Sequence, residues 1–280
     1  MTTTNLPSRL ENSSSRARRI AEAHFTSEVS NDADIIMRTM VSGDLITTAV
    51  VEGPPESRLL VSCKTPAEQR DHYGVVRSRI LVRGADLFTS VGADWYGFVH
   101  GIVHVELIAT GEIRANEMIG VMPVSDAEDA ILGEIGLAFP HDAKQGDAPG
   151  EPALERAANL KIHHNWLTAL RAGDTAQLTN SYSDDASVAA RLPGDPRLHP
   201  LRGREAVRAH YDELFSTYSI ESIDVMRRIV DRWYVFAELA WVLRTAEGQP
   251  VQYQSANAIV VGVDDRIIVD LGYGTDLTPA

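Results

Sequence analysis

The chain has 280 residues, of which 44% are apolar and 23% are charged, a balance that is typical of globular proteins and predicts order outside the ends. Its formal net charge of −13 offers no basic surface for phosphates, which argues against nucleic acid and against an anionic membrane as partners. A single cysteine, Cys63, excludes an internal disulfide, and no apolar run is long enough to span a membrane or to form a secretion signal, so we expect a cytoplasmic protein.

The chain repeats a pattern of its own. RDHYGVV begins at Arg70 and RAHYDEL at Arg208, and WYGF and WYVF follow at Trp95 and Trp233, in both cases 138 residues apart. Eight of 29 positions are identical at this offset, where average composition gives about two by chance. We therefore predict a duplicated domain, with a polar tail over 1–14, a divergent first copy over 15–140, a linker over 141–152 and a second copy over 153–280.

Helices are expected at the start of each half. In the first half Thr65 and Glu68 form a capping box with proline between them, which predicts a helix that carries His72. In the second half the patterns predict a long helix over 153–174, a shorter one within 175–185, a strand over 186–192 and a helix over 203–218. Three or four strands should follow in each half.

The strand after each tryptophan is apolar on both faces, and its ionisable residues lie on one face only. These residues are His100, His104 and Glu106 in the first half and Glu238 and Arg244 in the second. A strand without a solvent face must be covered on both sides. Helices can cover one face, and we expect the wholly apolar face to pack against a second sheet, within the chain or between chains.

Four stretches of the second half carry a resemblance to a known family: ALRAGDTAQLTNSYSDDASV, LRGREAVRAHYDELF, WYVFAELAWVL and DDRIIVDLGYG. This half resembles a SnoaL-like domain of the nuclear-transport-factor-2-like superfamily, which includes ketosteroid isomerases, scytalone dehydratase, polyketide cyclases and some epoxide hydrolases. The resemblance implies an α+β fold of two tandem cone-shaped domains, each a curved antiparallel sheet wrapped around helices with an apolar pocket. It also implies pairing through the sheets, as an intramolecular pseudo-dimer or a homo-oligomer. The family's orientation further implies that the ionisable strand face, with His100, His104 and Glu238, points into the pocket.

The sequence differs from ketosteroid isomerases at the positions of their functional residues. The catalytic aspartate of those enzymes falls at about Ala190, their helical tyrosine at about Trp166 and their oxyanion-binding aspartate at Asn257. Scytalone dehydratase is the better match, because its helical histidine corresponds to His210 and its Ser-x-Asn pair begins at Ser255. The first half resembles the family mainly through the repeat and lacks the GREA turn.

Imidazole suits proton abstraction near neutral pH, and an asparagine amide can donate to a developing oxyanion. The candidate catalytic residues are therefore His72, His100, His210, Glu238, Asn116 and Asn257, and the candidate substrate-binding residues are His24, His104, Trp166, Tyr253 and Ser255. Asn116 and Asn257 are paired by aligning IRANEMIGV with QSANAIVVG. We expect a cofactor-independent lyase or isomerase that acts on a small, apolar, oxygenated aromatic, polyketide-like or steroid-like molecule.

The alternatives to these roles are structural. His72 and His210, which recur in both halves, can pack and hydrogen-bond as structural residues, and Glu238 can pair with Arg244 or with a neighbouring strand. One or both domains can also be a ligand-binding or assembly module without activity. No metal site is expected, because His100 and His104 lie about 13 Å apart along a strand. The sequence leaves open which half is active and which reaction it performs.

Overall fold

A computed structural model of the chain describes residues 6–43, 46–53, 57–140 and 152–277. The chain divides into two compact units, Met1–Ala143 (unit 1) and Lys144–Ala280 (unit 2). The expected linker over 141–152 lies outside the described residues except for its last position, Pro152, where a helix begins. The expected polar tail over 1–14 is helical from Leu6 onward.

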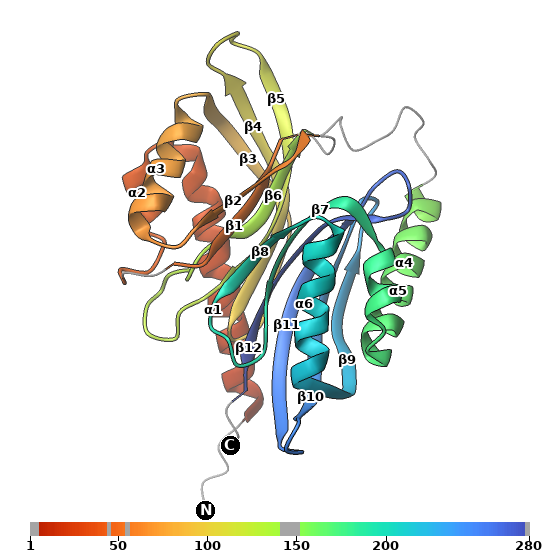
Figure 1. Cartoon of the computed structure of the whole chain (residues 1–280). Helices are drawn as coiled ribbons and strands as arrows, with labels where there is room; N and C mark the ends of the chain where they lie inside the picture. The colour runs from red at the N-terminus through yellow and green to blue at the C-terminus, as the bar shows by residue number, and fades with distance from the viewer. Residues whose placement is uncertain (1–5, 44–45, 54–56, 141–151, 278–280) are drawn as a thin grey trace, which may run out of the picture. The chain divides into compact units, whose positions relative to one another are not determined.

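In the part of unit 1 that the structure describes, a six-stranded sheet is accompanied by three α-helices and one short 3-10 helix (Figure 1). Its elements are α1 (Leu6–Ser27), η1 (Glu28–Ser30), α2 (Ala33–Met37), β1 (Thr48–Glu52), β2 (Leu59–Cys63), α3 (Pro66–Arg77), β3 (Ile80–Gly92), β4 (Tyr96–Leu107), β5 (Ile113–Pro123) and β6 (Ile135–Pro140). The strands run in the order β2-β1-β6-β5-β4-β3.

Unit 2 repeats this plan (Figure 1). Its elements are α4 (Pro152–Ala172), α5 (Thr175–Asn180), β7 (Tyr182–Arg191), β8 (Leu198–Arg202), α6 (Arg204–Thr217), β9 (Tyr218–Val230), β10 (Tyr234–Thr245), β11 (Pro250–Val261) and β12 (Ile267–Asp276). The order β8-β7-β12-β11-β10-β9 is the order of unit 1, strand for strand. The predicted α+β fold of two repeated sheet-and-helix domains is therefore confirmed.

Each sheet differs from the expected antiparallel sheet at one pair of strands. β1 runs parallel to β6 in unit 1, and β12 runs parallel to β7 in unit 2. Parallel neighbours need a long connection, and here most of each unit lies between the two strands. The strands and helix between the two parallel neighbours supply that long connection, so each sheet is mixed and not wholly antiparallel.

Local sequence accounts for the helix ends. The Thr65 hydroxyl accepts a hydrogen bond of 3.2 Å from the Glu68 amide at the start of α3, with Pro66 at the first turn. Asp174 caps α5 in the same way through the Gln177 amide, at 2.9 Å. Gly173 has a φ of +64°, a left-handed conformation that ends α4 at low cost. None of the helices within the described ranges is long and apolar enough to cross a membrane.

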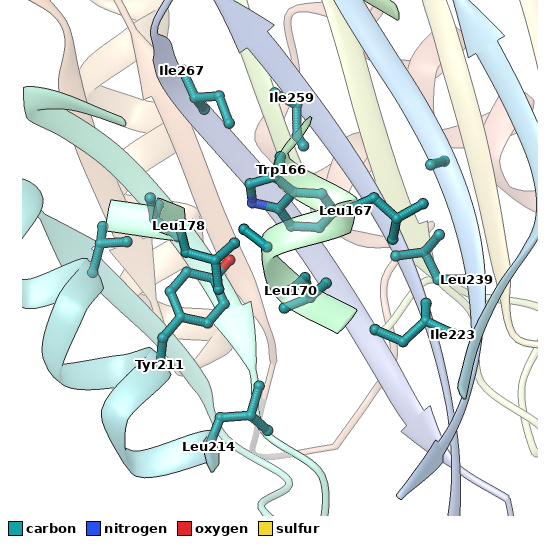
Figure 2. Packing of buried hydrophobic residues seen from close by; sticks show 14 of the residues in the cluster. Trp166, Leu167, Leu170, Leu178, Tyr211, Leu214, Ile223, Leu239, Ile259 and Ile267 are labelled. Atoms are coloured by element: carbon teal, nitrogen blue, oxygen red, sulfur yellow. The ribbon is translucent and has the colours of Figure 1, made fainter. Parts of the chain in front are cut away.

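The helices cover the wholly apolar face of each sheet, which corrects the expected orientation. Val99, Val103 and Val105 of β4 belong to the core of unit 1 together with residues of α1. In unit 2 the corresponding face of β10 packs with α4 and α6 through Ala237, Leu239, Trp241 and Leu243. Figure 2 shows Trp166, Leu170 and Tyr211, which these helices contribute to the same core. Helix-sheet cores are held by buried apolar area, so the face without ionisable groups meets the helices.

Candidate functional site

Unit 1 encloses a cavity of about 350 Å³ between α3 and the sheet. Its wall is mainly aliphatic, and Tyr73 is its one Phe, Tyr or Trp side chain among the described residues. The polar side chains that reach it are those of Glu28, Glu52, His72, Tyr73, Arg77, Arg79, Asn116 and Glu134. Ligand sites commonly measure about 300 Å³ or more and combine an apolar wall with a few polar groups, so this cavity has the size and composition of a small-molecule site.

His72 and Glu52 form a pair in this wall. Nε2 of His72 on α3 lies 3.1 Å from Oε1 of Glu52 at the end of β1. The hydrogen bond to Glu52 raises the pKa of His72, against the opposing effect of burial. Glu52 also fixes the tautomer, because an Nε2 proton directed at the carboxylate leaves Nδ1 as the basic atom of the neutral ring. The pair can therefore exchange a proton near neutral pH.

A second polar group lies deeper in the same unit. The Tyr73 hydroxyl on α3 donates a hydrogen bond of 3.3 Å to Oε2 of Glu134, which precedes β6. His24 of α1 is fully buried, with its Nε2 3.8 Å from that same oxygen. Arg77 forms an ion pair with Glu28 of η1. These three contacts tie α1, η1 and α3 to one another and to the segment before β6.

The two buried carboxyl groups of this cluster differ in acidity. Burial, reinforced by the charge of Glu134, raises the pKa of Glu28, although Arg77 acts in the opposite direction. Burial works against ionisation of Glu134 as well, but His24 in its charged form, close to the carboxylate, outweighs burial and lowers the pKa of Glu134. Burial also raises the pKa of Tyr73, so its hydroxyl stays protonated and remains a donor.

Unit 2 has a much smaller cavity at the equivalent place, about 40 Å³. Its described wall includes five of the predicted site residues: Trp166, His210, Tyr253, Ser255 and Asn257. The difference in size follows from one cross-strand pair. Val103 faces Asn116 across β4 and β5, whereas Trp241 faces Tyr253 across β10 and β11 with ring centroids 6.1 Å apart. Two aromatic rings occupy the space that is open in unit 1.

The centre of unit 2 is a hydrogen-bonded chain of side chains. Nε1 of Trp166 donates to the Tyr182 hydroxyl at 2.9 Å, and Tyr182 donates to Oδ2 of Asp270 at 2.6 Å. The Tyr211 hydroxyl lies 2.9 Å from that of Tyr182, and the Asn257 amide donates to Oδ1 of Asp270 at 3.4 Å. Burial raises the pKa of Asp270 to about 6, although the hydrogen bonds from Tyr182 and Asn257 lower it.

His210 lies at the edge of this chain but does not enter it. Its ring packs edge-on against Tyr211 and lies 6.1 Å from the ring of His199. Burial, helped by His199, lowers the pKa of His210 to about 4, so the imidazole is neutral at neutral pH. It therefore differs from His72, its counterpart in unit 1, in having no carboxylate partner among the described residues.

The strand pairing corrects one residue correspondence. Val99 pairs with Gly120, and Ala237, which lies 138 residues after Val99, pairs with Asn257. The counterpart of Asn257 is therefore Gly120, and the expected pairing of Asn257 with Asn116 is wrong. Asn116 instead corresponds to Tyr253, because register follows the cross-strand ladder and not the short stretch of similar letters.

Three predicted site residues lie on the other face of the sheet, away from the cavities. Nε2 of His100 is 2.9 Å from Oε1 of Glu117, and Nε2 of His104 is 2.9 Å from Oδ2 of Asp86. Glu238 lies 3.8 Å from Arg227 of the neighbouring strand β9. Because side chains alternate along β4 and β10, these three lie on the face of the sheet away from Val103 and Trp241, which line the cavities. The expectation that they point into a cavity is therefore wrong.

Glu134 and Asp270 are the residues that the sequence reasoning missed. The pairing of Gly120 with Gly136 and of Asn257 with Gly272 makes the two acids equivalent, because each lies two positions before its glycine. Both are buried, 5% and 3% exposed. The signal was present in ILGEIGLAF and IIVDLGYGT, where each apolar stretch contains one acid at the same place. A lone acid in a buried strand needs a partner, which marks it as a candidate polar centre.

Each unit is an α+β domain in which a mixed sheet and helices line a pocket. A family model described as a SnoaL-like domain matches residues 163–269. The match lies within unit 2, the half in which the sequence predicted it. No protein of curated function matches the chain.

Several solved structures are similar to part of the chain. A ketosteroid isomerase-like protein from Erwinia carotovora atroseptica is 18% identical, with a TM-score of 0.36, over 45% of this chain and 98% of its own. An LEH-like epoxide hydrolase from Mycobacterium tuberculosis is 18% identical, with a TM-score of 0.36, over 42% of this chain and 84% of its own. A proposed isomerase from Rhodopseudomonas palustris is 15% identical, with a TM-score of 0.37, over 42% of this chain and 88% of its own.

Proposed function

We propose that unit 1 is a lyase or isomerase that moves a proton on a small, largely apolar, oxygenated molecule and needs no organic cofactor. The observation that carries the proposal is the His72–Glu52 pair in the wall of a cavity of about 350 Å³. A cavity of roughly 150 Å³ holds benzene, so by proportion the unit 1 cavity has room for about 14 non-hydrogen atoms.

The proposed chemistry uses three side chains, those of His72, Glu52 and Asn116. Nδ1 of His72 takes a proton from a carbon next to a carbonyl group, and Glu52 stabilises the imidazolium that forms. The amide of Asn116 donates to the oxygen that gains charge in the enolate. The imidazolium then returns the proton to another carbon, which is isomerisation, or to a departing hydroxyl group, which is dehydration.

Proton exchange with solvent tests this proposal without knowledge of the natural substrate. The full chain is incubated in D₂O with alicyclic and aromatic ketones and β-hydroxy ketones, and deuterium incorporation and loss of water are measured by mass spectrometry. Replacing His72 by Gln should lower the rate by about 10²–10⁴-fold, the usual contribution of a general acid-base group. The matched variant His210→Gln changes the counterpart histidine in unit 2 and should keep the rate. Undiminished exchange in His72→Gln would refute the assignment.

The second candidate is a ligand-binding or assembly module without activity, and unit 2 favours the assembly role for that half of the chain. The side chains of Trp166, Tyr182 and Asp270 at its centre hydrogen-bond to one another, and its cavity of about 40 Å³ is too small for the molecules considered above. Tight ligand binding with no exchange in any of the ketones would extend this interpretation to unit 1. Association through the sheet faces, within one chain or between two, stays a prediction, which sedimentation analysis of the full chain would test.

A further inference from the structure

Unit 1 contains a cluster of side chains that the proposed proton transfer does not use. His24 of α1, Glu28 of η1 and Glu134 before β6 each direct one potential ligand atom to a common point, with these atoms within 4.8 Å of one another. His24 is fully buried, and Glu28 and Glu134 are 8% and 5% exposed. His24 and Glu28 lie four residues apart, but Glu134 comes from a segment more than 100 residues away, so no local sequence motif contains all three.

The ring of His24 is held in one orientation and one tautomer. The Thr39 hydroxyl donates to the carbonyl oxygen of Ile36 at 2.6 Å, so its oxygen must accept the 2.6 Å hydrogen bond from Nδ1 of His24. Nδ1 therefore carries a proton, and the neutral ring presents the lone pair of Nε2 to Glu134. A metal-binding histidine characteristically has its other nitrogen fixed by such an acceptor.

The distances around Nε2 suit a shared ion better than a direct hydrogen bond. Nε2 lies 3.8 Å from Oε2 of Glu134, which is beyond hydrogen-bond range, and 3.5 Å from the Tyr73 hydroxyl, which is at its limit. Two ligands that bind one ion at about 2.1 Å with angles near 110–120° lie about 3.4–3.6 Å apart. The distance of 3.8 Å between Nε2 of His24 and Oε2 of Glu134 needs an adjustment of only a few tenths of an ångström to reach that value.

The surrounding residues would support the carboxylate ligands. Tyr73 donates to Oε2 of Glu134 at 3.3 Å and so orients that carboxylate. Arg77 pairs with Glu28. A carboxylate has two oxygens, so Glu28 can hold Arg77 and bind an ion at once. A metal ion binds the neutral form of His24, and with that form the charged groups Glu28, Glu134 and Arg77 sum to one negative charge, which allows the buried cluster to take up a cation.

The cluster also has an open side. Glu28, Tyr73 and Glu134 all contribute to the wall of the cavity of about 350 Å³, so a ligand in that cavity can reach the point at which the three side chains converge. Three protein ligands with one position left for water or substrate is the arrangement of catalytic zinc sites, whereas structural sites are closed by four protein ligands.

From these contacts we infer that His24, Glu28 and Glu134 bind one divalent transition-metal ion of the Zn²⁺ or Co²⁺ type, with a coordination position open to the cavity. One imidazole and two carboxylates form a mixed nitrogen and oxygen set that suits such ions. An ion there would bind an oxygen atom of the molecule in the cavity. Only this last role rests on the proposed function, because binding of the ion does not depend on turnover.

Cobalt tests the site directly. The full chain is treated with EDTA, dialysed and titrated with Co²⁺ alone, with visible absorption and calorimetry as readouts and no substrate present. We expect one ion per chain and the absorption bands of a four- or five-coordinate Co²⁺ ion. Glu134→Gln and Glu28→Gln keep the side-chain shape and should each weaken binding by at least about tenfold. His24→Ala should abolish it.

The matched control is His104→Ala, which removes an exposed histidine that also pairs with a carboxylate, Asp86. It should leave Co²⁺ binding unchanged. Circular dichroism and a thermal melt show whether each variant is folded, and the two Gln variants keep the test valid if His24→Ala unfolds. Absence of stoichiometric binding, full affinity in folded Glu134→Gln, or loss of binding in His104→Ala would each overturn the site. None of these readouts depends on His72, so failure of the metal site and failure of the proposed reaction are distinguishable.

Discussion

Glu134 and Asp270 occupy the same register position in the two units, and each is joined to the tyrosine of the third helix of its unit. In unit 1 Tyr73 donates to Glu134 directly, at 3.3 Å. In unit 2 Tyr211 reaches Asp270 through Tyr182. The duplication has therefore kept a buried acid and a tyrosine at the centre of each unit, while their surroundings have diverged into an open cavity in one and a filled core in the other.

The acidity of Asp270 should make unit 2 respond to pH. The pKa of Asp270 is about 6 in the folded chain, raised by burial from 3.8. The Asp270 carboxyl group binds a proton more tightly in the folded chain than in the unfolded chain. Protonated Asp270 therefore contributes stability that is fully present below about pH 3.8 and is lost as the pH rises through about 6. The difference amounts to about 3 kcal/mol.

Asp270→Asn removes this titration. The unfolding free energy of the natural chain should therefore rise, relative to the variant, as the pH falls from about 7 to about 4. Urea unfolding followed by tryptophan fluorescence measures it, because Trp166, Trp233 and Trp241 all lie in unit 2. Asp264→Asn, which changes an exposed carboxyl group of the same unit, is the control. A difference that is constant with pH would contradict the assignment.

Protonation of His163 should change the stability of unit 2 with pH in the direction opposite to that of Asp270. Both ring nitrogens are buried without a hydrogen-bond partner among the described residues, and the side chain is 1% exposed. Burial, with the charge of Arg228, lowers the pKa of His163 from 6.5 to about 4. The unfolded chain therefore binds the proton first, so this group costs stability as the pH falls from about 6.5 to about 4.

His163→Leu should be more stable than the natural chain at about pH 5, by roughly 2 kcal/mol from the proton alone. Loss of the unpaired ring nitrogens should stabilise it further, by about 1–3 kcal/mol. Urea unfolding at pH 5 and at pH 7.5 checks both parts, since the first should disappear at the higher pH. His164→Leu, at the exposed neighbouring position, is the control. A variant less stable than the natural chain at both pH values would show that His163 has a partner.

The size of each cavity should follow the residue at the Val103 and Trp241 position. Val103→Trp should fill the unit 1 cavity and weaken binding of a compact alicyclic ketone such as camphor by at least about tenfold, as measured by calorimetry. Trp241→Val should open unit 2 and destabilise it by about 3 kcal/mol, because it removes a buried ring and its 2.9 Å hydrogen bond to Ser255. Unchanged binding in a folded Val103→Trp chain would place the ligand elsewhere.

Glu52 should control the protonation of His72. Because the hydrogen bond to Glu52 is the main cause of the raised pKa of His72, Glu52→Gln should lower that pKa. An NMR titration of histidine-labelled chain, with His72→Gln to assign the signal, measures the change. The pH profile of deuterium exchange should move in the same direction. A titration of His72 that is the same in both chains would separate Glu52 from the proposed reaction.

The sequence by itself determined the duplication, the two-domain α+β architecture and the family resemblance of the second half. These depend on local patterns, such as the capping box at Thr65 and the recurrence of His72 and Tyr73 as His210 and Tyr211, which can be seen along the chain. Tyr253, Ser255 and Asn257 were also placed correctly at a cavity wall, because they alternate along one strand.

Only the tertiary structure decided which face of the sheet meets the helices, how the two repeats align on their later strands, and which acids lie at the centre. Both faces of β4 are apolar enough to be buried, so periodicity could not choose between Val103 and His100 as the cavity side. The register of β5 depends on its hydrogen-bonded neighbours, which moved the counterpart of Asn257 from Asn116 to Gly120. His24, Glu28 and Glu134 converge because packing brings together segments that are more than 100 residues apart, and no local pattern contains that information.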